Sequence, residues 1–182
     1  MISYEVNFSK EAFSQSLIEH LCGEISNIKG GQSATQSEQV GSDCVLMFFA
    51  KVTEDVGEAI ANAVKTTDRS QSIFHHINVN FVSNDEIRKL NKQFRGKDSV
   101  TDVLSFNMDE EDLLGEVYIA PQFVASVVGD GSLPQELIRL IVHGTLHLLG
   151  YDHEESFKGY DGAADVEEMF KLQEEVVERV AF

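Results

Sequence analysis

The residues best suited to chemistry are three histidines close together in the C-terminal half of the chain: His143, His147 and His153. Side chains four residues apart lie on one face of an α-helix, so His143 and His147 can bind one metal ion. Gly150 can end that helix and turn the chain back, which brings His153 to the same ion. Three neutral nitrogen ligands leave one open position on a tetrahedral zinc ion, as in catalytic sites. The spacing therefore predicts one catalytic zinc ion per chain, used for hydrolysis.

These offsets resemble the metzincin metalloprotease motif, H-E-x-x-H-x-x-G-x-x-H. The protease general base is the glutamate directly after the first histidine, and Gly144 occupies that position here. Water bound to zinc has a pKa near about 7, so a nucleophile remains available, but the proton shuttle of the protease is lost. The sequence therefore argues against a protease, and it singles out no other general base.

The remaining histidines and the cysteines are expected to have structural roles. Nothing in the sequence provides partners for His20, His75 or His76. Cys22 and Cys44 lie far apart without a CxxC spacing, so we expect buried, reduced thiols rather than a disulfide.

The composition is that of one globular domain of 182 residues, with 42% hydrophobic and 25% charged residues. No stretch approaches the roughly 18 continuous apolar residues of a membrane span. The first residues lack a basic segment followed by an apolar run, so we expect no signal peptide. These features predict a cytoplasmic protein that does not bind membranes.

The charge is strongly acidic, with 31 acids against 14 bases and a formal net charge of −17. Because affinity for phosphates comes mainly from lysine and arginine, this balance argues against DNA or RNA binding through a broad basic face. One short region differs. Residues 86–97, here called the basic segment, contain five bases and one acid.

The N-terminal 72 residues give weak signals. We predict a strand over Ile2–Phe8, a helix over Glu11–Leu21, a surface loop over Lys29–Ser42, a buried strand over Cys44–Ala50 and a helix over Glu54–Val64.

The signals sharpen from Ile73 onward. Residues 77–81 alternate as a strand does, and Ser83 with Glu86 forms a capping box that opens a helix. The apolar stripe of that helix is Ile87, Leu90 and Phe94, and Gly96 ends it. Two antiparallel strands follow, near Thr101–Phe106 and Gly115–Ala120, joined by an acidic turn at 109–112.

Two further helices complete the prediction. A capping box at Ser132 and Gln135, with Pro134 in the first turn, starts a helix that runs to about Leu149. A last helix spans about Ala164–Val180, with Val166, Met169, Phe170 and Val177 as its apolar face. The result is an α+β fold in which a small mixed sheet of about four strands packs with about five helices. The zinc site lies on a helix and the loop after it.

Four segments together resemble the YbeY family, bacterial endoribonucleases that mature ribosomal RNA. The run HGTLHLLGYDHEE at 143–155 resembles the signature of the family, and three other segments match in order: 90–98, 101–106 and 114–119. The similarity extends from about His76 to the C-terminus. It implies an α+β metal-dependent fold and single-strand-selective RNA cleavage, in maturation of the 3′ end of small-subunit rRNA and in ribosome quality control. The implied partners are ribosomal RNA and the small ribosomal subunit, with ribosomal proteins or assembly GTPases as further candidates.

The resemblance also implies roles for individual residues. The three metal-binding histidines of the family correspond to His143, His147 and His153, and its essential arginine corresponds to Arg95. Arg95 lies in the basic segment, and a guanidinium can bind a phosphate through two hydrogen bonds and stabilise developing charge. By itself, an arginine at a helix end is more often a solvated surface cation.

Several features depart from the family pattern. Val100 replaces a usual proline, residues 156–164 resemble an insertion, and the N-terminal region of about 1–72 is extended and aligns poorly. We expect residues 1–182 to form a single YbeY-like domain. Two alternatives remain: a ribosome-assembly factor that binds without catalysis and uses its metal for stability, or a zinc hydrolase that cleaves another bond, such as an amide.

Overall fold

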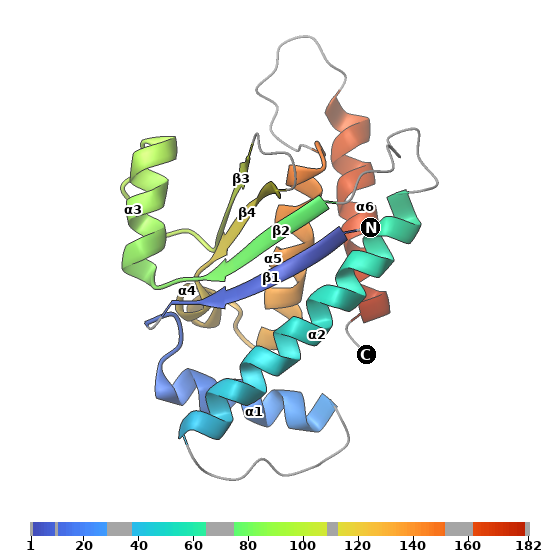
Figure 1. Ribbon diagram of the computed structural model, residues 1–182. Coiled ribbons are helices and arrows are strands. Elements are labelled where there is room, and N and C mark those ends of the chain that lie inside the picture. The colour runs from blue at the N-terminus through green and yellow to red at the C-terminus, as the bar shows by residue number, and fades with distance from the viewer. Residues whose placement is uncertain are drawn as a thin grey trace.

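The fold is built on one sheet of four strands: β1 (Ile2–Phe8), β2 (His75–Phe81), β3 (Val103–Asn107) and β4 (Leu113–Ile119). The strands lie in the order β1-β2-β4-β3 (Figure 1). β1 and β4 both run parallel to β2, whereas β3 pairs with β4 in the antiparallel direction. The predicted α+β class with a small mixed sheet is confirmed, and so is the antiparallel pairing of its last two strands.

The computed structural model describes residues 2–9, 11–28, 38–64, 75–108, 113–151 and 162–180. None of the helices in these ranges is long and apolar enough to cross a membrane. The predicted acidic turn at 109–112 lies outside them, as do residues 29–37 of the predicted loop and 156–161 of the apparent insertion.

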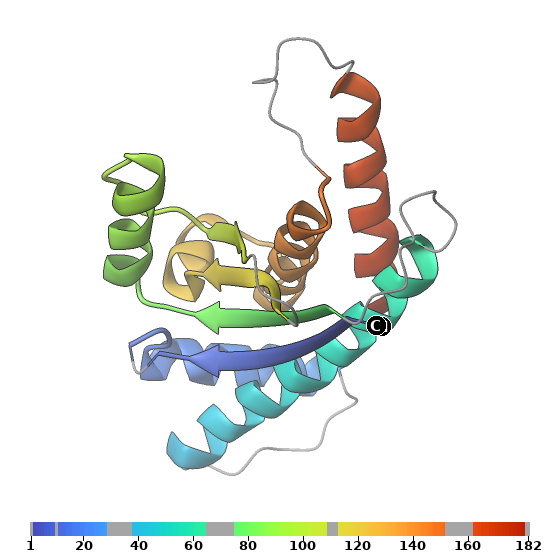
Figure 2. The same ribbon diagram turned by 45° about the horizontal axis from the view of Figure 1, so that its top comes forward.

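Six helices occur in the described part of the chain, one more than the approximate number predicted: α1 (Gln15–Ile28), α2 (Glu38–Val64), α3 (Asn84–Arg95), α4 (Pro121–Val127), α5 (Leu133–Leu148) and α6 (Gly162–Val180). The short α4 has no counterpart among the predicted helices. Helices α1, α2, α5 and α6 share one apolar core with the inward-facing strand residues, all fully buried: Ile77, Val79, Phe81, Val117 and Ile119. Figure 2 shows α6 standing alongside α5, with α3 at the opposite end of the molecule.

The predicted buried strand at Cys44–Ala50 is wrong, because these residues belong to the long helix α2. The apolar run divides between two helix faces: Val45 and Phe49 are buried, whereas Met47 is 72% exposed. A short continuous apolar run fits a strand and a buried helix equally well, so its periodicity could not decide between them. The predicted helix at 54–64 is the second half of α2.

Helix α3 confirms the predicted start and end signals. The side chain of Ser83 accepts a hydrogen bond from the Glu86 N–H, and the Glu86 carboxylate accepts one from the Ser83 N–H. Gly96 ends the helix with a left-handed φ of 69°, which costs glycine little. A second, smaller apolar cluster holds α3 against the other face of the sheet, through Ile87 and Leu104 among others.

Helix α5 begins where predicted but is capped differently. Pro134 lies in its first turn, yet the Ser132 side chain makes no capping hydrogen bond to the helix. Instead, the Glu24 carboxylate of α1 accepts hydrogen bonds from Ser132 Oγ at 3.2 Å and from the Leu133 N–H at 3.1 Å. A carboxylate near a helix N-terminus is also favoured by the helix dipole. The predicted capping box with Gln135 is therefore replaced by a residue from a distant helix.

The cysteines and two of the remaining histidines differ in detail from the expectation. Cys22 and Cys44 are free thiols, as predicted, but they are half-buried rather than buried. Burial raises the pKa of the Cys22 thiol to about 11, and a hydrogen bond with Cys44 adds to the shift. His20 lies 3.1 Å from Glu24, and His76 lies 3.1 Å from Ser3, so both histidines have surface partners that the sequence did not indicate.

The capping box of α3 can be tested by Glu86→Gln. We expect the free energy of unfolding to fall by about 1 kcal/mol at neutral pH. Hydrogen bonds from Ser9 Oγ and from the Ser83 N–H lower the pKa of the Glu86 carboxyl below its usual range. A carboxyl whose pKa is lower in the folded state contributes fully above the unfolded pKa and loses this contribution as the pH falls through the folded value. In urea unfolding, the difference in unfolding free energy between the wild type and Glu86→Gln should therefore be smaller in acid than at neutral pH. An equal difference at both would contradict this account.

Candidate functional site

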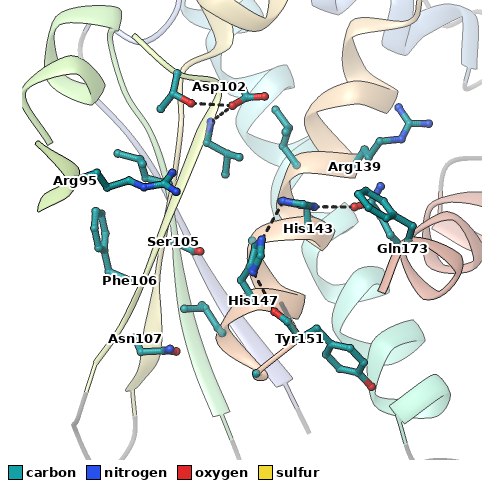
Figure 3. A pocket seen from close by; sticks show the side chains of 18 of the residues that line it. Arg95, Asp102, Ser105, Phe106, Asn107, Arg139, His143, His147, Tyr151 and Gln173 are labelled. Atoms are coloured by element: carbon teal, nitrogen blue, oxygen red, sulfur yellow. Dashed lines mark hydrogen bonds between the residues drawn. The ribbon is translucent and has the colours of Figure 1, made fainter. Parts of the chain in front are cut away.

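The two predicted helical ligands face a cleft of about 760 Å³ that runs between the edge strand β3 and helix α5. Its walls combine residues 103–107 of β3 with the exposed side of α5, and α6 contributes Phe170 and Gln173. Arg95 lines the same cleft from the end of α3 (Figure 3). The structure thus brings together three of the four predicted site residues. The fourth, His153, lies outside the described residues.

His143 and His147 point their rings into this cleft from successive turns of α5. The two Nε2 atoms lie 3.1 Å apart, and the ring planes are nearly perpendicular at 85°. Both side chains are half-buried. The four-residue spacing therefore has the predicted effect of directing both imidazoles to one point.

The outer nitrogens of both rings have acceptors that fix the tautomers. His147 Nδ1 lies 3.0 Å from the Tyr151 carbonyl oxygen, which can only accept a hydrogen bond. His143 Nδ1 lies 2.9 Å from Gln173 Oε1, while the amide nitrogen of Gln173 donates to Glu174 at 2.9 Å. Each Nδ1 therefore carries the proton, and in a neutral imidazole each Nε2 then presents a lone pair to the other.

This arrangement fits a zinc ion. Two lone pairs that face each other at 3.1 Å require a cation between them, either a proton or a metal ion. Nitrogen ligands at zinc bond lengths on a tetrahedron lie about 3.3 Å apart, close to the observed separation. Histidine ligands also characteristically donate their other N–H to a carbonyl or carboxylate oxygen. Within the described residues, no group of three or more histidine, cysteine or carboxylate side chains is placed to hold a metal.

The backbone after α5 turns as predicted. Gly150 has a left-handed φ of 87°, and its N–H donates to the His147 carbonyl at 2.9 Å. The Tyr151 N–H then donates to the Leu146 carbonyl at 3.0 Å, which brings the Tyr151 carbonyl beside the His147 ring. The glycine turn thus orients an imidazole as well as redirecting the chain.

A chain of hydrogen bonds that begins on α6 orients the His143 ring. Gln173 is 4% exposed and bridges His143 to Glu174, which in turn receives two hydrogen bonds from Arg139 at 2.9 and 3.2 Å. The hydrogen bonds from Arg139 hold the pKa of the Glu174 carboxyl below its usual range. Gln173 was not predicted. The available signal was a glutamine four residues after Met169, which places a polar side chain on an apolar helix stripe.

The two arginines of the cleft have different surroundings. Arg139 contacts Glu136 as well as Glu174, so its charge is already balanced by two carboxylates. Arg95 is an exposed side chain at the opposite wall and points toward the cleft across β3 (Figure 3). Of the two, Arg95 is the better placed to meet an anion that approaches from solvent.

Gly144 has a packing role that explains why the protease base is missing. A β-carbon at this position would lie 2.6 Å from Val117 Cγ1 and 2.9 Å from Val117 Cγ2. The helix therefore lies directly on β4 at this point, and no side chain fits between them. A glutamate here would have to separate α5 from the sheet.

Comparison with known proteins connects this geometry to a family. A family model described as endoribonuclease YbeY matches residues 46–181, which extends the similarity beyond the predicted start near His76 into α2. A protein of Thermotoga maritima named endoribonuclease YbeY is 45% identical over 107 residues, covering 58% of this chain and 67% of its own. A protein of Thermotoga petrophila with the same name is 41% identical over 134 residues, covering 72% and 82%. A solution structure from Thermotoga maritima is 30% identical with a TM-score of 0.44, covering 99% of this chain and 89% of that one.

The contact at Gly144 predicts an inverted response to a helix-favouring substitution. Alanine normally stabilises a helix by about 1 kcal/mol relative to glycine, but forced contacts in a packed core cost about 1–3 kcal/mol. We expect Gly144→Ala to lower the free energy of unfolding in urea, because the short, stiff Val117 side chain cannot move aside. Gly23→Ala in α1 is the matched control, since a β-carbon there meets nothing within 4 Å. It should be neutral or stabilising. A Gly144→Ala protein as stable as the wild type would contradict the contact.

Proposed function

We infer the function of this chain from its family: it belongs to the YbeY endoribonucleases, whose model matches residues 46–181 of its 182. We propose that it is a zinc-dependent endoribonuclease, which cleaves single-stranded RNA at internal phosphodiester bonds. We also propose that residues 1–182 act as one domain. The observation that carries the proposal is the pair of oriented histidines facing Arg95 across one cleft.

The proposed metal site consists of His143, His147 and His153. The hydrogen bonds from Nδ1 to Gln173 and to the Tyr151 carbonyl keep the Nε2 lone pairs of the first two histidines directed into the cleft. These residues would hold zinc as a Lewis acid, which would supply an acidified water or polarise a phosphoryl oxygen.

Arg95 binds the scissile phosphate in this proposal. A phosphodiester gains negative charge on its non-bridging oxygens as the nucleophile attacks, and a planar guanidinium can bind two such oxygens at once. The guanidinium lies on the wall opposite the histidines, so a phosphate between them would lie between Arg95 and the proposed zinc ligands. The carboxylates that line the cleft have other partners: Asp102 accepts from the Val103 N–H at 2.8 Å, and Glu136 contacts Arg139.

The cellular role that we propose is maturation of the 3′ end of small-subunit rRNA and ribosome quality control in the cytoplasm. The small ribosomal subunit is the proposed partner. The net charge of −17 supports this setting, because a protein with so few bases binds naked RNA weakly. RNA held by the ribosome reaches the cleft without a large basic surface on this chain. Tight binding of free RNA at physiological salt would contradict this part of the proposal.

The activity can be tested on single-stranded rRNA fragments incubated with zinc-loaded protein. We expect Arg95→Ala to lower kcat by about 10²–10³, because one charge-stabilising donor is removed. His147→Ala or a chelator should abolish cleavage. Arg88→Ala is the matched control, because it removes another arginine from the same helix. Arg88 pairs with Asp98 at 2.7 Å and does not line the cleft.

The outcomes separate the alternatives. Cleavage that survives both Arg95→Ala and His147→Ala, in proteins folded to the same degree, would identify a contaminating nuclease. A wild-type protein that cuts no ribosomal substrate yet binds the small subunit would favour an assembly factor. Release of product from amide substrates but not from RNA would favour a hydrolase of another bond.

The hydrogen bond between Gln173 of α6 and His143 predicts a specific effect on metal affinity. Gln173→Leu removes the acceptor for His143 Nδ1, so we expect zinc affinity to fall by about 10–100-fold in competition with a chromophoric chelator. Gln173→Glu keeps an acceptor for Nδ1, but its second oxygen would face the Glu174 carboxylate, so we expect an affinity between those of the wild type and Gln173→Leu. Gln122→Leu is the control, since the amide of Gln122 in α4 contacts the Glu11 carbonyl away from the cleft. Unchanged affinity in Gln173→Leu would show that the contact does not orient the ligand.

A further inference from the structure

Three aromatic rings form a row whose middle ring lines the cleft: Phe94 of α3, Phe106 of β3 and Tyr118 of β4. The ring centroids of Phe94 and Phe106 are 4.8 Å apart, and those of Phe106 and Tyr118 are 5.8 Å apart. Phe106 lines the cleft together with Arg95, the residue that follows Phe94 in the chain. The aromatic row is therefore continuous with the proposed active site.

Phe94 is the exposed end of this row. The predicted apolar stripe of α3 starts at the fully buried Ile87, but it ends at Phe94, which is 57% exposed. Packing of the helix accordingly accounts for Ile87 and leaves most of the Phe94 ring in contact with water. The tilted contact with Phe106, at an interplanar angle of 52°, supports the ring on one side and leaves much of it exposed.

The charge around Phe94 is opposite in sign to that of the whole chain. The basic segment supplies it, because α3 and the residues just after it contain Arg88, Lys89, Lys92, Arg95 and Lys97. Arg88 and Lys92 both pair with Asp98, which ties the loop after the helix to the helix itself. Arg95 directly follows Phe94 in the chain, and Lys97 follows one residue later, after Gly96. An anionic ligand with a flat apolar part matches this combination of groups.

We propose that Phe94 stacks against an unpaired nucleobase of the RNA, in the nucleotide next to the phosphate that Arg95 binds. This rests on the proposed function and adds a base-binding subsite to it. Stacking on aromatic side chains is available to every base, so the subsite does not require a particular sequence. It does require an unpaired strand, because a base inside an A-form helix has both faces covered by its neighbours. The subsite thereby supplies a physical basis for selectivity toward single strands.

The test uses single-stranded oligonucleotides that carry 2-aminopurine or an abasic site at each position in turn. For zinc-loaded wild-type protein, we expect 2-aminopurine fluorescence to be quenched at one position, and an abasic site there to raise KM about tenfold. Phe94→Leu should raise KM by a similar factor, with a smaller effect on kcat, and should be insensitive to the abasic site. Phe94→Trp should restore both the quenching and the KM. Met47→Ala is the control, since it removes an exposed apolar side chain from α2, away from the cleft.

The outcomes distinguish this inference from the proposed activity. Cleavage by Phe94→Leu with unchanged KM, and equal sensitivity of both proteins to abasic sites, would overturn the subsite while leaving the nuclease intact. A second outcome is that the wild-type protein quenches 2-aminopurine while Phe94→Leu does not, with no RNA cleavage by either protein. That result would support the subsite and overturn the activity. A wild-type protein that neither quenches nor cleaves would overturn both.

Discussion

The close approach of helix α5 to strand β4 is the constraint on which the rest of the structure depends. At Gly144 the helix backbone rests directly on Val117, and one turn later Leu148 would collide with any β-carbon at Gly115. Two glycines, one on each element, therefore set the spacing between helix and sheet. This spacing places the histidines on the exposed side of α5 at the level of the edge strand β3, so that the sheet edge forms the opposite wall of the cleft. The residue that a metalloprotease would use as base is excluded by the packing that positions the ligands.

Many helix ends, turns and strands could be predicted from the sequence, because short segments of the chain determine them. The Ser83–Glu86 capping box, the Gly96 and Gly150 turns and the alternation in β2 all depend on residues a few positions apart. The apolar run at 44–50 was misassigned because a short apolar run fits a strand and a buried helix equally well. The other errors arose where distant parts of the chain decide, as at the cap of α5, which comes from Glu24 in α1. Gln173 was missed for the same reason, since its partner lies 30 residues away.

The cleft contains two arginines, and each has a different role. One arginine, Arg139, is held between two carboxylates and serves to fix Glu174, which fixes Gln173 and through it His143. The other, Arg95, extends from the basic segment toward the cleft. An acidic chain with one basic region disfavours phosphates over most of its surface and favours them at one place. The proposed weak binding of free RNA and the proposed phosphate site at the cleft both follow from this one charge pattern.

The contact between His143 and Gln173 has a consequence for the order in which the protein is made. The histidines lie on α5, but the glutamine that orients the first of them lies on α6, in the last stretch of the described chain. During synthesis the sheet and α5 emerge before α6 is available. A partly synthesised chain therefore carries both imidazoles without the acceptor that sets the tautomer of His143. Synthesis of α6 is what turns a pair of histidines into an oriented pair, so the proposed metal site would be incomplete in a nascent chain that still lacks this helix.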